Sequence, residues 1–316
     1  MQLSQPRHYS NPSIMATNSS LLLIGSRGQL GSELQTILPP QHNLVALDRQ
    51  QLDLTDSKAI RDAVESAQPQ LIINAAAYTA VDRAESEPGL AEAVNAISPG
   101  ILAESAAQIG SPFIHVSTDY VFDGQQSRPY QETDETCPLG VYGRTKQAGE
   151  AAVQAAGGHA LIVRTAWVYS ARGKGNFVKT MLRLGAEHQE IRVVADQVGA
   201  PTWAQDLARA IAHLSDRLLE ENPSPTLEPG IYHFTNSGVA SWYDFAVAIF
   251  EEARSQGFPL KVERVRPIAT EEYPTPASRP AYSVLSCAKI SAVLGAPPPH
   301  WRQGLRQMLQ DLKALQ

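Results

Sequence analysis

The chain of 316 residues has few cysteines, no long apolar run and no excess of basic residues. Its two cysteines, Cys137 and Cys287, lie far apart and lack the spacing of metal ligands. This favours a reducing compartment and argues against a disulfide framework. The formal net charge of -6 argues against nucleic acid as the main partner. Because no apolar stretch is long enough to cross a bilayer, we expect no membrane partner and a cytoplasmic location.

The first residues are polar and contain proline, asparagine and serine, without the apolar core that a signal peptide carries. We therefore expect residues 1–20 to be a disordered extension. The chain has no repeat of solenoid type, and its length is ample for a substantial core. Composition alone leaves open one large domain or two interleaved lobes.

Short apolar strands alternate with helical stretches in the first half of the chain. The expected strands are 21–24, 44–48, 71–74, 112–117 and 160–164. This alternation predicts an α/β fold, a Rossmann-type doubly wound parallel sheet with helices on both faces. The second half is less regular. It has helical stretches over 176–188, 204–219 and 242–254, and proline-containing loops at 222–225 and 273–280.

These patterns predict a dinucleotide-binding Rossmann domain over 21–165, joined by part of 200–236. Residues 166–316 are expected to form mainly a smaller, interleaved C-terminal substrate-binding lobe. Such a lobe is suited to closing over a substrate.

A glycine-rich turn follows the first strand and precedes the helix-forming residues Glu33 to Leu38. Strand, glycine turn and helix together are typical of a dinucleotide site, whereas a glycine triplet alone is an ordinary turn. Gly25 allows a tight turn, Gly28 lets the backbone approach a pyrophosphate, and Gly31 lets the helix lie close to the strand. The pyrophosphate is expected on the amides at the helix N-terminus. The candidate residues here are Gly25, Gly28, Gln29, Leu30 and Gly31.

Asp48 ends the second strand, roughly twenty residues after the glycines. An acid in this place binds the adenosine ribose hydroxyls and favours NADH, although a solvated loop carboxylate or a helix cap would give the same pattern. Arg49 beside it can accept a 2′-phosphate, so NADPH stays open as the cofactor. Asp53 and Leu54 are expected near the adenine. Further candidates for cofactor binding follow the third strand, and they are Ala77, Tyr78 and Thr79.

A hydroxyl residue and a Tyr-x-x-x-Lys pattern are candidates for proton transfer at a carbonyl. Thr118 follows the fourth strand, at the carboxyl edge where doubly wound folds bind ligands. Tyr142 and Lys146 stand four apart, so a helix places them on one face. A free phenol has a pKa of about 10, and a neighbouring ammonium is expected to lower it. Taken alone, this pattern also fits a surface tyrosine and a solvated lysine.

These motifs occur in the order found in the extended short-chain dehydrogenase/reductase superfamily. More specifically, the chain from Leu21 onwards resembles the dTDP-4-dehydrorhamnose reductase family. The matching segments are 74–82, 117–124, 138–143, 164–169 and 196–202, together with Arg279-Pro280, Ser283 and Leu285.

The resemblance implies that NAD(P)H reduces the 4-keto group of a dTDP-sugar, dTDP-4-dehydro-L-rhamnose, to give dTDP-L-rhamnose. It also implies a role for each motif residue. Tyr142 donates the proton, Lys146 binds the nicotinamide ribose, and Thr118 hydrogen-bonds the carbonyl; Tyr142 and Lys146 thus also contact the cofactor. The implied substrate-binding residues are Asp119, Trp167 and Arg279. Without the resemblance, Trp167 fits a core aromatic and Arg279 a solvated loop charge.

Some family members use a divalent cation at a dimer contact, and Glu33 matches one such position. The C-terminal helix, however, has Gln310-Asp311-Leu312 where a glutamate would be needed. We therefore expect no catalytic metal, and a homodimer stays open. Two other functions also stay open: a nucleotide-sugar epimerase or dehydratase, and a non-catalytic regulatory subunit of the methionine adenosyltransferase type. Thr118-Asp119-Tyr120 lacks the Asp-Glu pair of a dehydratase.

Overall fold

The computed structural model describes residues 19–38, 42–220 and 227–315. The predicted disordered extension lies outside these residues except for Ser19 and Ser20, and so does the predicted loop 222–225. Among the described residues, no helix is long and apolar enough to cross a membrane.

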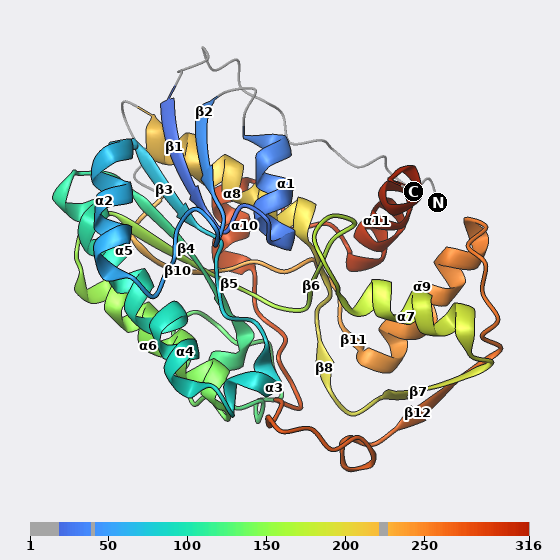
Figure 1. Ribbon diagram of the computed structural model, residues 1–316. Coiled ribbons are helices and arrows are strands. Elements are labelled where there is room, and N and C mark those ends of the chain that lie inside the picture. Colours follow the sequence, from blue (N-terminus) through green and yellow to red (C-terminus); the bar gives the residue numbers. More distant parts are fainter. Residues whose placement is uncertain (1–18, 39–41, 221–226, 316) are drawn as a thin grey trace.

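A parallel sheet of six strands forms the centre of the larger part of the molecule, in the order β10-β5-β4-β3-β1-β2 (Figure 1). This confirms the predicted fold class. The strands are β1 (Ser19–Ile24), β2 (His42–Leu47), β3 (Leu71–Asn74), β4 (Phe113–Thr118), β5 (Ala160–Thr165) and β10 (Gly230–His233).

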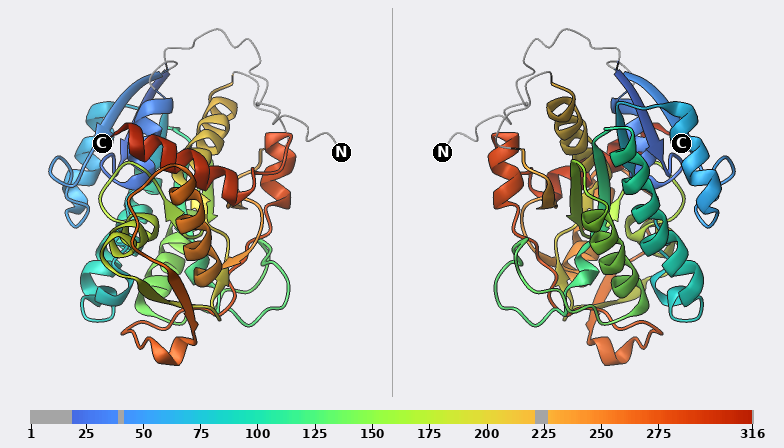
Figure 2. Two further views of the ribbon diagram at one scale, coloured as in Figure 1. Left: turned by 90° about the vertical axis from the view of Figure 1, so that its right-hand side faces the viewer. Right: turned by 90° about the vertical axis from the view of Figure 1, so that its left-hand side faces the viewer.

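Helices cover both faces of this sheet because its strands are apolar on both sides. Leu21 and Leu23 point into a core shared with α1, α8 and α10, whereas Leu22 and Ile24 point into a core shared with α2 and α5. In the right-hand view of Figure 2, α5 and α6 run side by side across one face. The helices are α1 (Gln29–Ile37), α2 (Ser57–Ala67), α5 (Ser98–Gln108), α6 (Val141–Ala155), α8 (Ala204–Leu219) and α10 (Ala288–Leu294).

A local signal fixes the start of α2. Asp56 caps this helix by accepting hydrogen bonds from the Lys58 and Ala59 amides. Three short helices lie between β3 and α5: α3 (Val81–Ala84), α4 (Pro88–Glu92) and the π-helix η1 (Ala93–Ile97). A 3-10 helix, η2 (Asp119–Val121), follows β4.

The second half of the chain builds a smaller lobe around helices and short strand pairs. Its core is rich in aromatic side chains, including Trp203, Phe245 and Trp301. The elements are β6 (Val168–Tyr169), α7 (Phe177–Glu187), β7 (Glu190–Val194), β8 (Val198–Gly199), β9 (Thr202–Trp203), β11 (Ala240–Ser241), α9 (Trp242–Ser255), β12 (Arg264–Ile268), the 3-10 turn η3 (Thr270–Glu272) and α11 (Trp301–Ala314).

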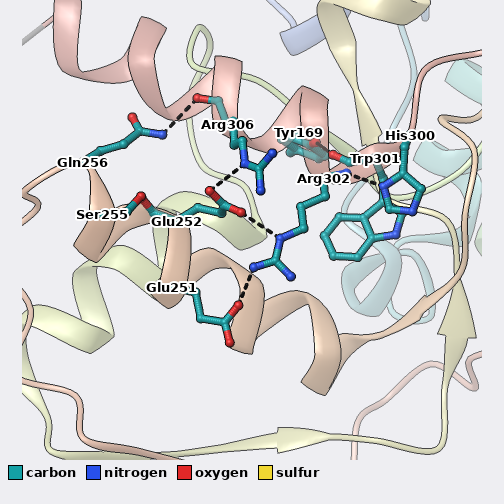
Figure 3. Close-up of polar contacts among 9 residues, drawn as sticks. All are labelled: Tyr169, Glu251, Glu252, Ser255, Gln256, His300, Trp301, Arg302 and Arg306. Carbon is teal, nitrogen blue, oxygen red and sulfur yellow. Dashed lines mark hydrogen bonds and ion pairs between the residues drawn. The ribbon is translucent and has the colours of Figure 1, made fainter. Parts of the chain in front are cut away.

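Ion pairs hold α11 against α9 in this lobe (Figure 3). Glu252 accepts hydrogen bonds from Arg302 over 2.7 Å and from Arg306 over 2.8 Å. Glu251 pairs with Arg302 at the exposed rim. Tyr169 donates to the carbonyl of Trp301, which ties the start of α11 to β6. The lobe therefore depends on contacts between segments far apart in the chain.

The two halves of the chain are interleaved. Residues 230–233, as β10, add a strand to the large sheet, and α8 (residues 204–219) and α10 pack against its core. How cofactor and substrate divide between the two parts stays a prediction.

Candidate active site

The hydroxyl of Thr118 lies at the carboxyl end of β4, where the strand passes into η2. Its oxygen accepts a hydrogen bond from the Tyr120 amide over 3.2 Å and donates one to Asp119 over 3.1 Å. Thr118 and Asp119 are both buried. Burial raises the pKa of Asp119 to about 6, and hydrogen bonds with Ser283 and Thr118 oppose the rise. The hydroxyl is thus held in place by its neighbours.

Tyr142 and Lys146 lie one turn apart on α6, as their spacing predicts, and both are buried. The Tyr142 ring packs edge to face on Tyr120, with 5.4 Å between the ring centroids. Gly143 permits this close approach of α6 to η2, because a Cβ there would lie 2.2 Å from the Tyr120 carbonyl oxygen. The Thr118 hydroxyl lies close enough to the Tyr142 phenol to influence its pKa. The hydroxyl and the phenol therefore meet, although 24 residues separate them.

The prediction that Lys146 lowers the pKa of Tyr142 is wrong for this structure. Burial raises that pKa to about 12, the nearby Thr118 hydroxyl opposes the rise, and the charge of Asp119 adds to it. The physical reason is that the Lys146 Nζ is directed elsewhere: it donates to the Val116 carbonyl over 2.7 Å and lies 3.2 Å from Nε2 of His115. Tyr142 is consequently a phenol at neutral pH, the form that can donate a proton.

The environment of Lys146 contains a residue that the sequence did not single out, His115. Burial lowers the pKa of Lys146 to about 8, with the charge of Glu150 opposing the shift. Burial also lowers the pKa of His115 well below its usual value, so the imidazole is neutral. The sequence feature that could have identified His115 is a polar side chain inside the apolar run Phe113–Val116.

The glycine turn has the geometry of a nucleotide cradle. Gly25 has φ +86°, and a Cβ on it would lie 2.7 Å from the Ala76 amide nitrogen. A Cβ on Gly31 would lie 2.1 Å from the Gly25 carbonyl oxygen. These two positions require glycine, as predicted. The helix begins at Gln29, one turn before the helix-forming residues Glu33 to Leu38 noted in the sequence.

The early start of α1 follows from Gly28, whose extended backbone forms the N-cap. Among the residues that the structure describes, no side chain caps the first turn or accepts from its amide groups. The amides of Gln29, Leu30 and Gly31 belong to this turn, which is the arrangement that binds anions. The Gln29 side chain reaches the other lobe, donating to the Val168 carbonyl over 3.4 Å and accepting from Asn176 over 2.8 Å.

Asp48 is buried at the end of β2 and already has partners. One carboxylate oxygen accepts from the amides of Gln50 and Gln51, and the other pairs with Nε of Arg27 at 2.7 Å. Arg27 lies inside the glycine turn and is 74% exposed, so a ligand that reaches Asp48 also meets this guanidinium. The sequence analysis did not single out Arg27. The feature that could have identified it is a cationic residue between two glycines of the motif.

The other cofactor candidates occupy two loops. Asp53 is exposed and turned towards its own loop, where it accepts from the amide and hydroxyl of Thr55. The Asn95 side chain accepts a hydrogen bond from the Tyr78 amide and donates one to the Tyr78 carbonyl. The Tyr78 hydroxyl donates to Glu87 over 2.5 Å. Asn95 is fully buried and was not anticipated. The remaining three are partly buried or exposed at these loops, namely Leu54, Ala77 and Thr79.

Trp167 and Arg279, the candidates for the substrate, both have protein partners. Trp167 has φ +47° and stacks on Trp242, with ring centroids 3.5 Å apart. Its indole lies over Gly199, where any Cβ would clash at 2.6 Å. Arg279 donates to Asp82 over 2.8 Å and leaves 22% of its side chain exposed. A diphosphate would have to share this guanidinium with Asp82.

Glu33 is buried within a set of polar contacts. It accepts from Ser170 over 2.5 Å and lies 3.7 Å from the Arg172 guanidinium. Burial raises its pKa, and the charge of Asp311 raises it further. Within 19–38, 42–220 and 227–315, no three acidic, histidine or cysteine side chains gather as a metal site would require. The absence of a catalytic metal stays a prediction.

Comparison with known proteins places these residues in a family. The model of the RmlD substrate binding domain matches residues 19–314. A dTDP-4-dehydrorhamnose reductase from Burkholderia thailandensis is 45% identical over 294 residues, which is 92% of this chain and 98% of the relative. The reductase of the same name from Escherichia coli K12 is 44% identical over 93% of this chain and 98% of the relative.

Solved structures agree with this assignment. A dTDP-4-dehydrorhamnose reductase from Clostridium acetobutylicum is 40% identical and superposes with a TM-score of 0.85 over 93% of this chain and 99% of that one. The Bacillus anthracis reductase, solved in complex with NADP, is 37% identical, with a TM-score of 0.85 over 93% of this chain and 100% of its own. A Thermus thermophilus UDP-glucose 4-epimerase, at 20% identity, shares the fold alone. The chain belongs to the dTDP-4-dehydrorhamnose reductase family.

Proposed function

We propose that this chain reduces the 4-keto group of dTDP-4-dehydro-L-rhamnose to give dTDP-L-rhamnose, with NADPH or NADH as the reductant. The observation that carries the proposal is the meeting of the Thr118 hydroxyl and the Tyr142 phenol at the carboxyl end of β4, with Lys146 one turn along α6. Relatives that are 40–45% identical over more than nine-tenths of the chain bear the name of this reductase.

The residues of the turn after β1 fit a dinucleotide. The uncapped first turn of α1 offers amide groups to the pyrophosphate, and Gly25 and Gly31 leave no side chain in its way. Asp48 would accept hydrogen bonds from ribose hydroxyls, in competition with Arg27. The same Arg27, with Arg49, offers positive charge to a 2′-phosphate. This pairing of one acid with two cations is consistent with use of both NADH and NADPH. The loop candidates Asp53, Leu54, Ala77, Tyr78 and Thr79 would line the adenosine side.

When bound, the reduced nicotinamide supplies a hydride to the keto carbon. The side chains of this protein act on the oxygen, where negative charge develops. Thr118 holds the oxygen by a hydrogen bond, and Tyr142, kept protonated by its raised pKa, donates the proton. Lys146 would hold the nicotinamide ribose. Burial of all three groups excludes water and strengthens each of these interactions.

We assign the sugar and its nucleotide to the second lobe and the loops that face the site. Asp119 would contact the sugar, Trp167 would form an aromatic wall, and Arg279 would share its guanidinium between Asp82 and the diphosphate. We also propose a cytoplasmic enzyme and carry a homodimer as a hypothesis, which light scattering at two protein concentrations would test.

A coupled assay tests the proposal. The protein would be given dTDP-glucose, the upstream dehydratase and epimerase, and NADPH or NADH. We expect the absorbance of the reduced cofactor to fall only when this protein, the dehydratase and the epimerase are all present. No loss with either cofactor, while the upstream product accumulates, would overturn it.

Two other functions predict different results. A nucleotide-sugar epimerase retains its cofactor, so purified protein carrying tightly bound NAD and turning over without added cofactor would favour it. A regulatory subunit would associate stably with a methionine adenosyltransferase and oxidise no NAD(P)H with any nucleotide sugar. The buried Thr118, Tyr142 and Lys146 argue against a purely structural role.

A further inference from the structure

The indole of Trp167 lies against two residues that one short strand pair carries. β8 and β11 run antiparallel, with Ala240 opposite Gly199 (Figure 1). Trp242 follows β11 directly, as the first residue of α9. Gly199 and Trp242 both contact the Trp167 indole, so the β8–β11 pair fixes the distance between its two neighbours.

The contact with Trp242 is a nearly parallel stack. The ring centroids of Trp167 and Trp242 lie 3.5 Å apart, and the ring planes differ by 5°. Aromatic pairs left to themselves prefer offset or edge-to-face arrangements, so the surrounding structure imposes this centred stack. Phe177, at the start of α7, packs on the Trp242 ring with 4.6 Å between centroids. Trp242 is therefore supported from behind while it covers one face of the Trp167 indole.

The contact with Gly199 leaves no space for a side chain. A Cβ at Gly199 would lie 2.6 Å from Cε2 and 2.8 Å from Nε1 of Trp167. Gly199 does not have a positive φ, so glycine is needed here for the close approach of the indole and not for its backbone conformation. Any larger residue would have to displace the indole.

The backbone of Trp167 is strained at the point where the chain leaves the large sheet. Its φ of +47° lies in the left-handed region, which disfavours residues with a bulky side chain. β5 ends at Thr165 and β6 begins at Val168, so this reversal leads the chain from the sheet into the smaller lobe. A strained residue persists only where its surroundings determine its conformation. The contacts with Trp242 and Gly199 supply that constraint on the side chain.

We propose that Trp242 is a positioning residue that, together with Gly199, holds the Trp167 indole in a single orientation facing the sugar of a bound nucleotide sugar. The inference rests on the proposed function, because it takes Trp167 as the wall of the sugar site. Trp167 is partly exposed, so a part of the indole that Trp242 does not cover is open to a ligand. A side chain that is already ordered loses less conformational entropy when the ligand binds, so a fixed indole increases the affinity for the sugar.

Binding measurements test whether Trp242 acts on the sugar. Calorimetric titration would give dissociation constants for dTDP-L-rhamnose, for dTDP, which lacks the sugar, and for NADPH. Trp242→Leu should weaken binding of dTDP-L-rhamnose by about 3- to 10-fold and leave dTDP and NADPH within about twofold. Trp242→Phe keeps a ring for the stack and should recover most of the affinity. Equal losses for all three ligands would show that Trp242 only supports the fold and would overturn the proposal.

A double substitution tests whether Trp242 acts through Trp167. In a Trp167→Ala background, Trp242→Leu should cause no further loss of dTDP-L-rhamnose affinity, because the indole that it positions is gone. Gly199→Ala displaces the indole from its other neighbour and should give the same selective loss. Tyr243→Leu is the matched control, since Tyr243 follows Trp242 on α9 and packs on the same core. It should change none of the three affinities. Additive losses in the double variant would contradict the proposal.

Nuclear magnetic resonance of the ligand-free protein separates this inference from the proposed function. The chain has four tryptophans, and the indole N–H signal of Trp167 is identified by its loss in Trp167→Phe. We expect one sharp signal in the wild type and in Trp242→Phe, and a split or broadened signal in Trp242→Leu. A signal that shifts in Trp242→Leu but stays single and sharp would overturn the proposal. If the wild type bound no dTDP-L-rhamnose, the proposed function would fail, and the N–H signal would still decide whether Trp242 positions Trp167.

Discussion

The strands of the large sheet and those of the smaller lobe differ in how they are buried. In β1, β3 and β5 nearly every side chain is buried, whereas β7 and β12 alternate between buried and exposed or are mostly exposed. The lobe instead depends on an aromatic core and on ion pairs between α9 and α11. The difference shows that one region is specified by local apolar runs and the other by contacts across long stretches of chain.

The largest expected effect concerns the chemistry at the carboxyl edge of the large sheet. Tyr142→Phe removes the proton donor and leaves the ring packed on Tyr120, so binding of NADH should be unchanged. Turnover should fall by about 10²- to 10⁴-fold, the usual contribution of a positioned acid. Single-turnover rates would measure this, and a rate similar to that of the wild type would remove Tyr142 from the role of acid.

The next prediction tests the stability of the sheet region. Glu150 and Arg164 form an ion pair in which both side chains are almost fully buried, at 2.6 Å. Glu150→Gln leaves the guanidinium uncompensated and should cost about 3–5 kcal/mol of unfolding free energy in a urea titration. Glu104→Gln, which breaks an exposed pair with Arg61, is the control and should change it by less than about 1 kcal/mol. Equal losses of unfolding free energy in the two variants would mean that burial does not determine how much an ion pair stabilises the fold.

Lys146→Ala should weaken both cofactor binding and rate. Loss of one or two hydrogen bonds from a buried amine predicts roughly a 10- to 100-fold fall in cofactor affinity. Fluorescence titration with NADPH measures the affinity separately from turnover. An affinity equal to that of the wild type would count against a contact between Lys146 and the ribose.

A corresponding change in the smaller lobe should have a smaller effect. Glu252→Gln weakens the hydrogen bonds to Arg302 and Arg306, and we expect a loss of about 1–2 kcal/mol because both arginines are partly exposed. Glu251→Gln is the matched control on the same helix, and it should cost less than about 0.5 kcal/mol. A larger loss of unfolding free energy in Glu251→Gln than in Glu252→Gln would contradict the greater stabilisation that we assign to the hydrogen bonds of Glu252.

The Glu252 pair also predicts a pH dependence. Hydrogen bonds from Arg306 and Arg302 lower the pKa of Glu252 from its ordinary value of 4.5. Its stabilisation is therefore complete above that value and is lost as the pH falls through the lowered one. The difference in unfolding free energy between wild type and Glu252→Gln should shrink below pH 4.5 and be constant from pH 6 to 8.

How much of this arrangement was predictable depends on how local each signal is. Five of the six sheet strands were predicted because apolar runs act within a few residues, whereas β10 was not anticipated as a strand. The sequence did not give the first residue of α1, because Gly28, which was assigned to the turn, is also the helix N-cap. A motif that names a residue does not give its backbone geometry.

The environment of the site was less predictable. The pairing of Asn74 with His115 depends on the register of β3 against β4, which no local pattern records. Trp167 stacks on Trp242, 75 residues later, at a φ that a tryptophan rarely adopts. Tyr142 and Lys146 were found by their spacing, but the direction of Lys146 away from the phenol required the structure.

The smallest expected effect concerns the choice of cofactor. Asp48→Ala should loosen NADH more than NADPH, by about 1 kcal/mol, because it removes an acceptor for the ribose hydroxyls and frees Arg27 for a 2′-phosphate. Dissociation constants for both cofactors measure the difference. Equal losses for NADH and NADPH would mean that Asp48 does not select between them.

A structure of the protein with NADPH bound tests the central claim most directly, namely that the glycine turn and the Thr118, Tyr142 and Lys146 side chains serve one cofactor. We predict the pyrophosphate on the first turn of α1 and the nicotinamide beside Tyr142 and Lys146, with Thr118 facing the same space. A cofactor bound elsewhere, or a nicotinamide out of reach of Tyr142, would contradict it.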